Sequence, residues 1–270
     1  MTLLDANEYT SSRLTGRADF SDSSDNVDID NGGYYEEIRS QYISLNSGDD
    51  IFRGTAFDSL GWDNRVNGNR GNDQIWGNTG RDMLRGGKDD DALHGGNSGS
   101  DWLRGDKGDD RLFGSTFGRN VLRGGNHDDR LFGGKNRDLL VGDTGKDELT
   151  GNAGSDLFVL RTEVASDGLS NAAANLNQAD RITDFNNAED YIVLPKVSGL
   201  NKINIGVQGG DSYIFMGFNP GETMSFAGVI EGVVGIDPTR VIVGDQANAV
   251  AAGMNVDFHL ANPNLDSFGI

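Results

Sequence analysis

Aspartate and asparagine recur at a fixed spacing between residues 50 and 156, each placed two residues before an apolar side chain. Regular rows of carboxylates can bind hard cations, which take six or more oxygen ligands from carboxylates and exposed carbonyls. The spacing defines twelve units over residues 45–159, among them GNRGNDQIW (68–76), GGKDDDALH (86–94) and GGNHDDRLF (124–132). A short period of this kind predicts a solenoid.

Two nine-residue units are expected to form one coil, so the sixth positions of odd and even units fall on two opposite edges. The odd row is Asp50, Asp73, Asp91, Asp110, Asp129 and Asp147, and the even row is Asn64, Asp82, Asp101, Asn120, Asp138 and Asp156. Carboxylates on neighbouring coils, roughly 4.8 Å apart, would repel by about 3 kcal/mol at an effective dielectric near 20. Such rows need counterions, and an oxygen-rich site suits Ca²⁺ better than Mg²⁺ or a transition metal.

Glycine and the apolar residues position these carboxylates. Glycine at positions one, two and four of a unit predicts turns with positive φ. The fourth position is otherwise taken by Asp89, His127 or Asn136, which are types that tolerate this region. Positions seven to nine predict a strand with its middle residue pointing inward. This inward set is Phe52, Val66, Ile75, Leu84, Leu93, Leu103, Leu112, Leu122, Leu131, Leu140, Leu149 and Phe158.

The units resemble the GGxGxDxUx consensus of the repeat-in-toxin (RTX) family of calcium-binding β-rolls, over 115 of the 270 residues. The resemblance implies an all-β, right-handed parallel β-roll with an ion between successive turns, held by the sixth-position Asp and by turn carbonyls. Residues 180–194 also resemble a segment that flanks the repeats in serralysin-type proteins. The matching residues are Asp180, Ile182, Asp184, Phe185, Asp190, Ile192 and Leu194.

The number of ions follows from the irregular units. The three over-long units, 54–67, 95–104 and 114–123, and both Asn substitutions all lie in even units. We therefore expect about five ions on the odd row and a patchy even row, filled most surely at Asp82/Asp101 and Asp138/Asp156, which is about five to nine Ca²⁺ in all. The alternatives are a calcium-free glycine-rich solenoid and a disordered acidic chain, but neither requires Asp and Leu two residues apart in so many units.

Composition agrees with this prediction. The net charge of −19 and the 40 glycines oppose compaction unless cations bind, and the acidity argues against nucleic acid as a partner. The chain has no cysteine, and no apolar run is long enough to span a membrane. The N-terminus has no classical signal-peptide pattern. RTX-like proteins typically leave the cell by type I secretion on a C-terminal signal. We therefore expect a secreted, extracellular or cell-surface protein, although the ending NLDSFGI could equally be a frayed terminus.

The flanks predict three further regions. Residues 1–44 are expected to form a partly irregular N-terminal cap, with a disordered arm as the alternative for 1–30. Residues 160–245 are expected to form a C-terminal β capping domain. It contains two strands within 180–194 and further strands at 203–207, 212–218, 223–229 and 239–243. Residues 164–179 predict a loop or short helix, and 246–270 a tail in which 248–254 could be helical.

No pattern of catalytic residues was found. The histidines His94, His127 and His259 lack His-Glu-x-x-His spacing, and neither a G-x-S-x-G elbow nor a P-loop occurs. A non-enzymatic structural or assembly component is the favoured function. A glycan-binding module is the alternative, and a hydrolase of unrecognised type is less favoured. Outward-facing residues form a possible surface for self-association or for a cell-surface glycan, unless the flanking regions cover them. They are Trp76, His94, Phe113 and Phe132 on the odd face, and Met83, Trp102, Val121, Leu139 and Leu157 on the even face, beside Arg85, Arg104 and Arg123.

Overall fold

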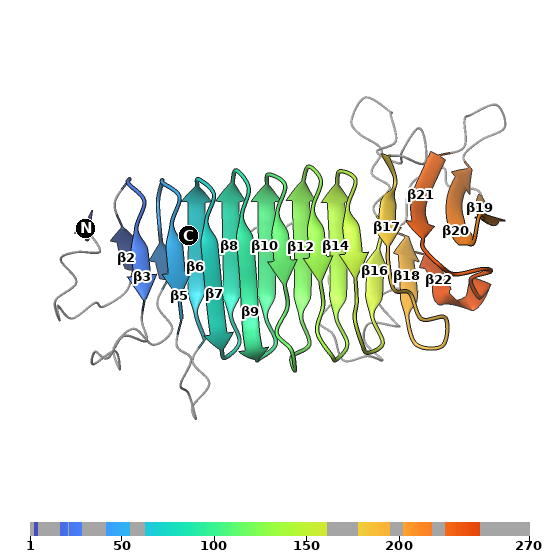
Figure 1. The fold of residues 1–270 in the computed structure, drawn as a ribbon, viewed down its shortest axis with the longest axis horizontal. Helices are drawn as coiled ribbons and strands as arrows, with labels where there is room; N and C mark the ends of the chain where they lie inside the picture. The colour runs from blue at the N-terminus through green and yellow to red at the C-terminus, as the bar shows by residue number, and fades with distance from the viewer. Residues whose placement is uncertain are drawn as a thin grey trace.

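The computed structural model describes residues 3–4, 17–20, 22–28, 42–54, 63–160, 178–194, 202–217 and 225–243. These residues form two sheets of eleven strands each, stacked along one long axis (Figure 1). In spatial order, sheet A is β1 (Leu3–Leu4), β2 (Arg17–Phe20), β4 (Tyr42–Ser44), β6 (Arg65–Arg70), β8 (Met83–Lys88), β10 (Trp102–Lys107), β12 (Val121–Asn126), β14 (Leu139–Thr144), β16 (Leu157–Val159), β18 (Tyr191–Leu194) and β22 (Val241–Val243).

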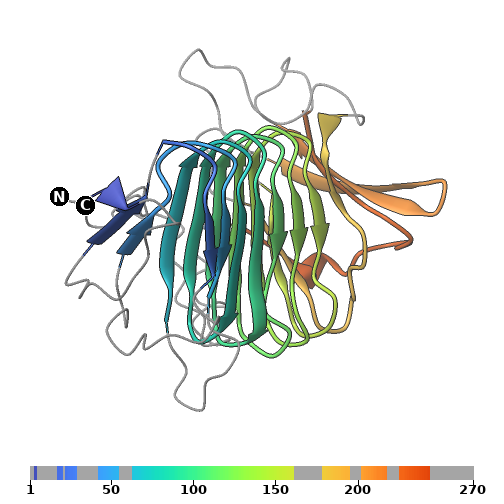
Figure 2. The ribbon, with the colours of Figure 1, turned by 60° about the vertical axis from the view of Figure 1, so that its left-hand side comes forward.

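Sheet B begins with the three strands β19 (Lys202–Gln208), β20 (Asp211–Gly217) and β21 (Ser225–Ile230). It continues with β17 (Asp180–Ile182), β15 (Glu148–Thr150), β13 (Arg130–Phe132), β11 (Arg111–Phe113), β9 (Ala92–Ser98), β7 (Gln74–Thr79), β5 (Ile51–Arg53) and β3 (Asn26–Asp28). Odd repeat units supply sheet B and even units supply sheet A. Within the repeats all neighbours are parallel, so the predicted all-β parallel β-roll is confirmed. Figure 2 shows the coils stacked behind one another.

The core between the sheets is built from the eighth position of every unit. All twelve predicted side chains are buried, with exposed fractions of 0–1%. They stack in register along each sheet, as Leu84, Leu103 and Leu122 do on sheet A. Since a lone unit has no partner for its apolar side chain, this continuous column explains why the coils are stable only together.

Glycine has two different functions in the turns. Positive φ occurs at positions two and four, as predicted, including Asp89 (75°) and His127 (84°), but Asn136 does not adopt it. The prediction of positive φ at position one is wrong, because first-position glycines such as Gly68 and Gly105 lack it. There the reason is space, since a Cβ on Gly105 would overlap the carboxylate of Asp110.

The strands are longer than the three residues predicted per unit. Seven of the twelve repeat strands continue through positions one to three of the next unit, as in β8 and β9. The backbone therefore keeps pairing with its neighbours through the second-position residue despite its positive φ. The turns lengthened in units 95–104 and 114–123 both join a sheet B strand to a sheet A strand, so they lie on one edge as expected.

The C-terminal flank extends both sheets. The two strands expected within 180–194 are present, and they form one more coil because β17 pairs with β15 and β18 pairs with β16. The four further predicted strands correspond to β19, β20, β21 and β22, the last preceded by a 3₁₀ turn at Pro238–Arg240. The β19–β20–β21 meander is antiparallel.

The N-terminal flank is described in part. Here β2 pairs with β4 and β3 pairs with β5, so these segments continue the sheets of the roll. Several predicted regions lie outside the described residues. They are most of the loop or helix predicted at 164–179, the inserted residues 55–62, the tail 246–270 and most of the expected N-terminal cap. No helix within the described ranges is long and apolar enough to cross a membrane.

The outer faces of the sheets differ from each other. On sheet B, Trp76, His94, Phe113 and Phe132 form a half-buried stack with successive ring centroids 5.1, 4.5 and 5.0 Å apart and nearly parallel planes. On sheet A the apolar row is half-buried from Met83 to Val121. Leu139 and Leu157 were expected to be exposed, and this is wrong. They are 3% and 0% exposed and pack in a second apolar cluster with Val141, Val159, Val193 and Ile242.

Candidate metal centres

The sixth-position aspartates lie immediately before the strands, on the two edges where the chain turns between sheets. They are buried, with exposed fractions of 0–2%. In each row the backbone N–H of one aspartate donates to Oδ1 of the equivalent residue one coil further along. On the odd row, Asp73 donates to Asp91 at 2.8 Å and Asp110 donates to Asp129 at 2.9 Å. The coil geometry therefore holds every carboxylate in the same orientation.

Each sixth-position Asp or Asn is called a rung of its row. In most of the aspartate rungs, the second carboxylate oxygen, Oδ2, has no hydrogen-bond partner among the described residues. Among the described residues, the Oδ2 atoms that are buried without a hydrogen bond belong to Asp50, Asp73, Asp82, Asp91, Asp101, Asp110, Asp129 and Asp147. Each lies against the first turn of its own unit, and in the regular units against the first-position glycine, as Asp73 lies against Gly68. A buried carboxylate oxygen without a donor is costly, so the chemistry of these eight atoms fits a cationic partner.

The same turns bring backbone oxygens into the gaps between coils. A Cβ on Gly108 would overlap the carbonyl oxygen of Asp89, and a Cβ on Gly125 would overlap that of Asp106. Carbonyl oxygens at positions two and four therefore point from one coil toward the next. Together with one carboxylate per rung, they provide the all-oxygen surroundings that Ca²⁺ uses.

Burial raises the pKa of these carboxyl groups. The pKa rises from 3.8 to about 9 for Asp91 and Asp129 and to about 7 for Asp110, with burial as the main cause and the backbone N–H bond acting in the opposite direction. Neighbouring aspartates raise it further, as Asp73 and Asp110 do for Asp91. The ionised form of these carboxyl groups is therefore disfavoured unless a divalent cation neutralises it.

No three His, Asp or Glu side chains converge on one point within the described ranges. The candidate sites are therefore not clusters of carboxylates like those of compact metal centres. Each coil supplies one sixth-position carboxylate to the gap beside it, and the backbone oxygens of the turns are the other protein ligands at hand.

The two asparagines interrupt the even row in a defined way. The Asn120 side-chain nitrogen Nδ2 donates to Asp138 Oδ1 at 2.9 Å and to the Ser115 carbonyl at 3.0 Å. Asn64 does the same toward Asp82, at 2.8 Å. An amide N–H therefore lies in each of these two gaps, where it donates to Oδ1 of the next aspartate. Oδ2 of Asp82 still has no donor.

The expected pair Asp138/Asp156 differs from the other rungs. Oδ2 of Asp138 already accepts a hydrogen bond from the Gly134 backbone N–H. Burial still raises the pKa of Asp138 to about 7 and that of Asp156 to about 9. The gap Asp82/Asp101 keeps two Oδ2 atoms without a donor and is therefore the stronger candidate of the two.

Sequence reasoning missed three rungs. Asp25 donates to Asp50 at 2.6 Å, Asp147 donates to Asp180 at 3.1 Å, and Asp156 donates to Asp190 at 2.9 Å. These aspartates also lie two residues before an apolar side chain, as in DRI (180–182). The spacing from Asp to apolar residue could have identified them, but it falls outside the regular nine-residue period.

Sequence reasoning also missed a second, exposed column on the odd edge. At the fifth position, the backbone N–H of Asp109 donates to Asp90 and that of Asp128 donates to Asp109, at 2.8 and 3.1 Å. Asp49 and Asn72 continue it. This column lies in water, so it carries charge without the burial that marks the sixth position.

Replacing a first-position glycine tests the contact between turn and carboxylate. We expect Gly105→Ala to displace the Asp110 carboxylate, because the added Cβ would overlap Oδ2. The calcium midpoint of folding, measured by circular dichroism, should then rise several-fold. Gly209→Ala is the control for a strained turn outside the repeats, because its φ is 67° while its added Cβ meets no atom within 4 Å. An unchanged midpoint for Gly105→Ala would show that the packing of this oxygen is unimportant.

Comparison with known proteins agrees with this geometry. The family model of the RTX calcium-binding nonapeptide repeat matches the chain in four copies, at residues 63–93, 95–116, 115–140 and 133–160. A search of curated proteins gave no match. The matched segments contain Asn64 and every sixth-position residue from Asp73 to Asp156. Residues 63–160 therefore contain four matches to the model of the RTX calcium-binding nonapeptide repeat, and they fold as a parallel β-solenoid that is consistent with an RTX β-roll.

Proposed function

We propose that Ca²⁺ binds in the gaps between successive coils, with the sixth-position carboxylates as ligands. The ligands proposed are Asp50, Asp73, Asp91, Asp110, Asp129 and Asp147 on one edge, and Asp82, Asp101, Asp138 and Asp156 on the other, with Asp180 and Asp190 extending the rows. The observation that carries the proposal is the set of eight buried Oδ2 atoms without a hydrogen-bond donor. Bound ions neutralise the negative charge of these buried carboxylates.

A matched pair of substitutions tests the assignment. Asp110→Asn keeps the Oδ1 acceptor for Asp91 and replaces Oδ2 by an amide N–H, as already occurs at Asn120. It should therefore lower the ions bound by about two, one for each gap beside the rung. Asn120→Asp should instead add at least one ion. Equilibrium dialysis with ⁴⁵Ca²⁺ gives the count, and equal counts in both variants and the parent chain would refute the assignment.

Calcium-dependent folding supports a function outside the cell. Extracellular calcium-binding modules bind near 10⁻⁴–10⁻³ M, far above the calcium concentration of the cytosol. With a net charge of −19 and uncompensated buried carboxylates, the chain remains unfolded where calcium is scarce and folds where it is plentiful. This difference suits a protein exported unfolded, by type I secretion, and completed outside as an extracellular or cell-surface protein.

A structural or assembly function fits the shape best. The roll is rod-like, and the stacked rings of sheet B run along it, half-buried and therefore still partly open to a partner. The calcium-binding β-roll is a structural repeat, and we infer a non-enzymatic function. Glycan binding is the second candidate, since aromatic rows also suit sugar rings. A groove on the outer face of sheet A favours glycan binding, because it is lined by basic side chains that include Arg85, Arg104 and Lys88.

The assembly function can be tested on the half-buried rings of sheet B. At millimolar Ca²⁺ we expect self-association, seen by light scattering, to weaken about tenfold in Phe113→Ser/Phe132→Ser, since large aromatic side chains dominate interface energies. Trp102→Ser/Val121→Ser on sheet A is the parallel variant for the other face. Unchanged association in both variants would exclude both surfaces as contacts between copies.

A further inference from the structure

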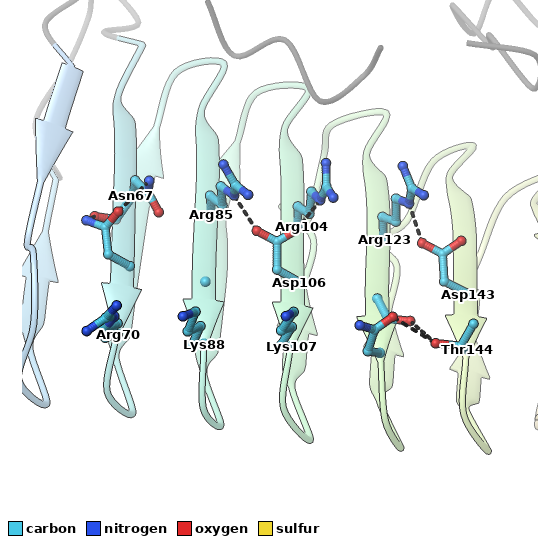
Figure 3. Close-up of a pocket in the computed structure, with 14 residues that line it drawn as sticks. Asn67, Arg70, Arg85, Lys88, Arg104, Asp106, Lys107, Arg123, Asp143 and Thr144 are labelled. Carbon is cyan, nitrogen blue, oxygen red and sulfur yellow. Dashed lines mark hydrogen bonds and ion pairs between the residues drawn. The ribbon is translucent and has the colours of Figure 1, made fainter. Parts of the chain in front are cut away.

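A groove of about 710 Å³ crosses the outer face of sheet A over β6, β8, β10, β12 and β14. Figure 3 shows two rows of basic side chains along it: Arg85, Arg104 and Arg123 in one row, and Arg70, Lys88 and Lys107 in the other. Against these six cations the groove has two carboxylates, Asp106 and Asp143, which gives a net charge of +4. It is thus a basic surface on a strongly acidic chain.

The cations are placed side by side by the register of the sheet. Arg104 is the direct partner of both Arg85 and Arg123, and Lys88 is the partner of both Arg70 and Lys107. Like charges directly opposite on neighbouring strands destabilise a sheet. The arrangement therefore has a cost that nothing in the fold requires, because ninth and third positions elsewhere accept uncharged residues such as Val141 and Thr144.

Only the inner row forms ion pairs with carboxylates within the described part of the chain. Asp106 pairs with Arg85 and Arg104, and Asp143 pairs with Arg123. The outer row of Arg70, Lys88 and Lys107 is exposed and has no carboxylate of the described residues within ion-pair distance. Three parallel cations, spaced at about the 4.8 Å repeat of the coils, thus remain for an external anion.

The shape of the groove favours a thin, linear polyanion. The rows run across the strands, along the axis of the roll, so their charges repeat once per coil (Figure 3). A polysaccharide with one carboxylate per sugar ring repeats its charge over a similar length. A nucleic acid duplex would also meet the acidic edges of the roll, where the chain's negative charge repels it. Half-buried Trp102, two residues before Arg104 on the same face, offers a ring to a sugar.

We propose that this groove binds a linear acidic polysaccharide, with carboxylates on successive sugar rings paired to the basic rows of sheet A. The site rests on the calcium-folded roll proposed above, because only stacked coils align the cations. This proposal gives the glycan-binding alternative a defined surface and a class of ligand. The aromatic stack of sheet B lies on the opposite face and is not part of it.

Binding to a hexagalacturonate oligosaccharide, by isothermal titration calorimetry at constant millimolar Ca²⁺, tests the proposal. The triple variant Arg70→Gln/Lys88→Gln/Lys107→Gln should bind about tenfold more weakly, as expected for three exposed charge pairs. The matched control, Arg111→Gln/Arg130→Gln/Lys146→Gln, removes the same charge from exposed positions of odd units and should bind like the parent chain. Fully methyl-esterified hexagalacturonate should not bind.

Circular dichroism of every variant at the same Ca²⁺ separates this test from the calcium proposal. A parent chain that fails to fold with calcium would refute the calcium proposal, whereas a folded chain that ignores the oligosaccharide overturns the groove alone. Equal binding by both triple variants would show that Ca²⁺ merely bridges sugar carboxylates to the acidic edges, and it would overturn the groove as well. Tighter binding of a single-stranded oligothymidine than of the hexagalacturonate would overturn the choice of ligand.

Discussion

In excess chelator at pH 7.5, the purified chain is expected to lose most of its sheet signal in circular dichroism, and millimolar Ca²⁺ is expected to restore it. The reason is a balance of similar magnitudes. One repulsive carboxylate pair per gap costs about 3 kcal/mol at an effective dielectric near 20. Burial of one Leu per unit contributes about 1.5–3 kcal/mol, which is no larger than this repulsion. Without cations the coils therefore have no surplus stability.

Mg²⁺ at equal ionic strength distinguishes specific binding from screening. Mg²⁺ prefers a small octahedral site and retains its waters, so it should restore little of the signal. Full recovery in Mg²⁺ or in NaCl would mean that screening suffices and that ordered sites are unnecessary. The same sheet content and melting temperature in chelator as in calcium would contradict calcium-dependent folding altogether, and the export argument with it.

The sequence predicts the roll well because its period is local. The eighth-position column from Phe52 to Phe158 follows from an Asp-to-apolar spacing that each unit repeats, and all twelve side chains are buried as expected. The positive φ at most second and fourth positions follows from residue type, as at Asn69 and Asp106, but Gly134 and Asn136 depart from it. These features depend on interactions within one coil or with its immediate neighbour.

What the sequence could not predict depends on contacts between coils. First-position glycine was attributed to φ, yet Gly105 is required because the Asp110 carboxylate lies against it. That contact is known only when the turn is built. The burial of Leu139 and Leu157 depends likewise on packing with Val193 and Ile242, more than thirty residues further along the chain. The hydrogen bond from the Asn120 amide to Asp138 likewise depends on a residue one coil further along the chain.

Acidification should refold the chelated chain, which is the opposite of its effect on the calcium-bound form. Burial raises the pKa from 3.8 to about 6 for Asp101 and to about 9 for Asp91. For a group whose pKa is raised by folding, the stabilising contribution is complete below the unfolded value and is lost as pH rises through the folded value. In chelator, stability should therefore fall as pH rises from about 4 to 9, and acidification to pH 5.2, still above the isoelectric point near 4.3, should restore part of it.

With calcium the sign reverses, because Ca²⁺ binds the ionised carboxylate and competes with protons. The variant Asp91→Asn/Asp129→Asn separates the two effects, since it removes two of the carboxylates whose pKa is highest, about 9 each. In chelator at pH 7.5 it should be more folded than the parent chain, and in calcium it should need more Ca²⁺ to fold. Far-ultraviolet circular dichroism across pH 5–9, with light scattering to exclude aggregation, measures both. If acid leaves the chelated parent unfolded, or if the double variant shifts both conditions in the same direction, buried carboxylate charge is not what keeps the ion-free roll from folding.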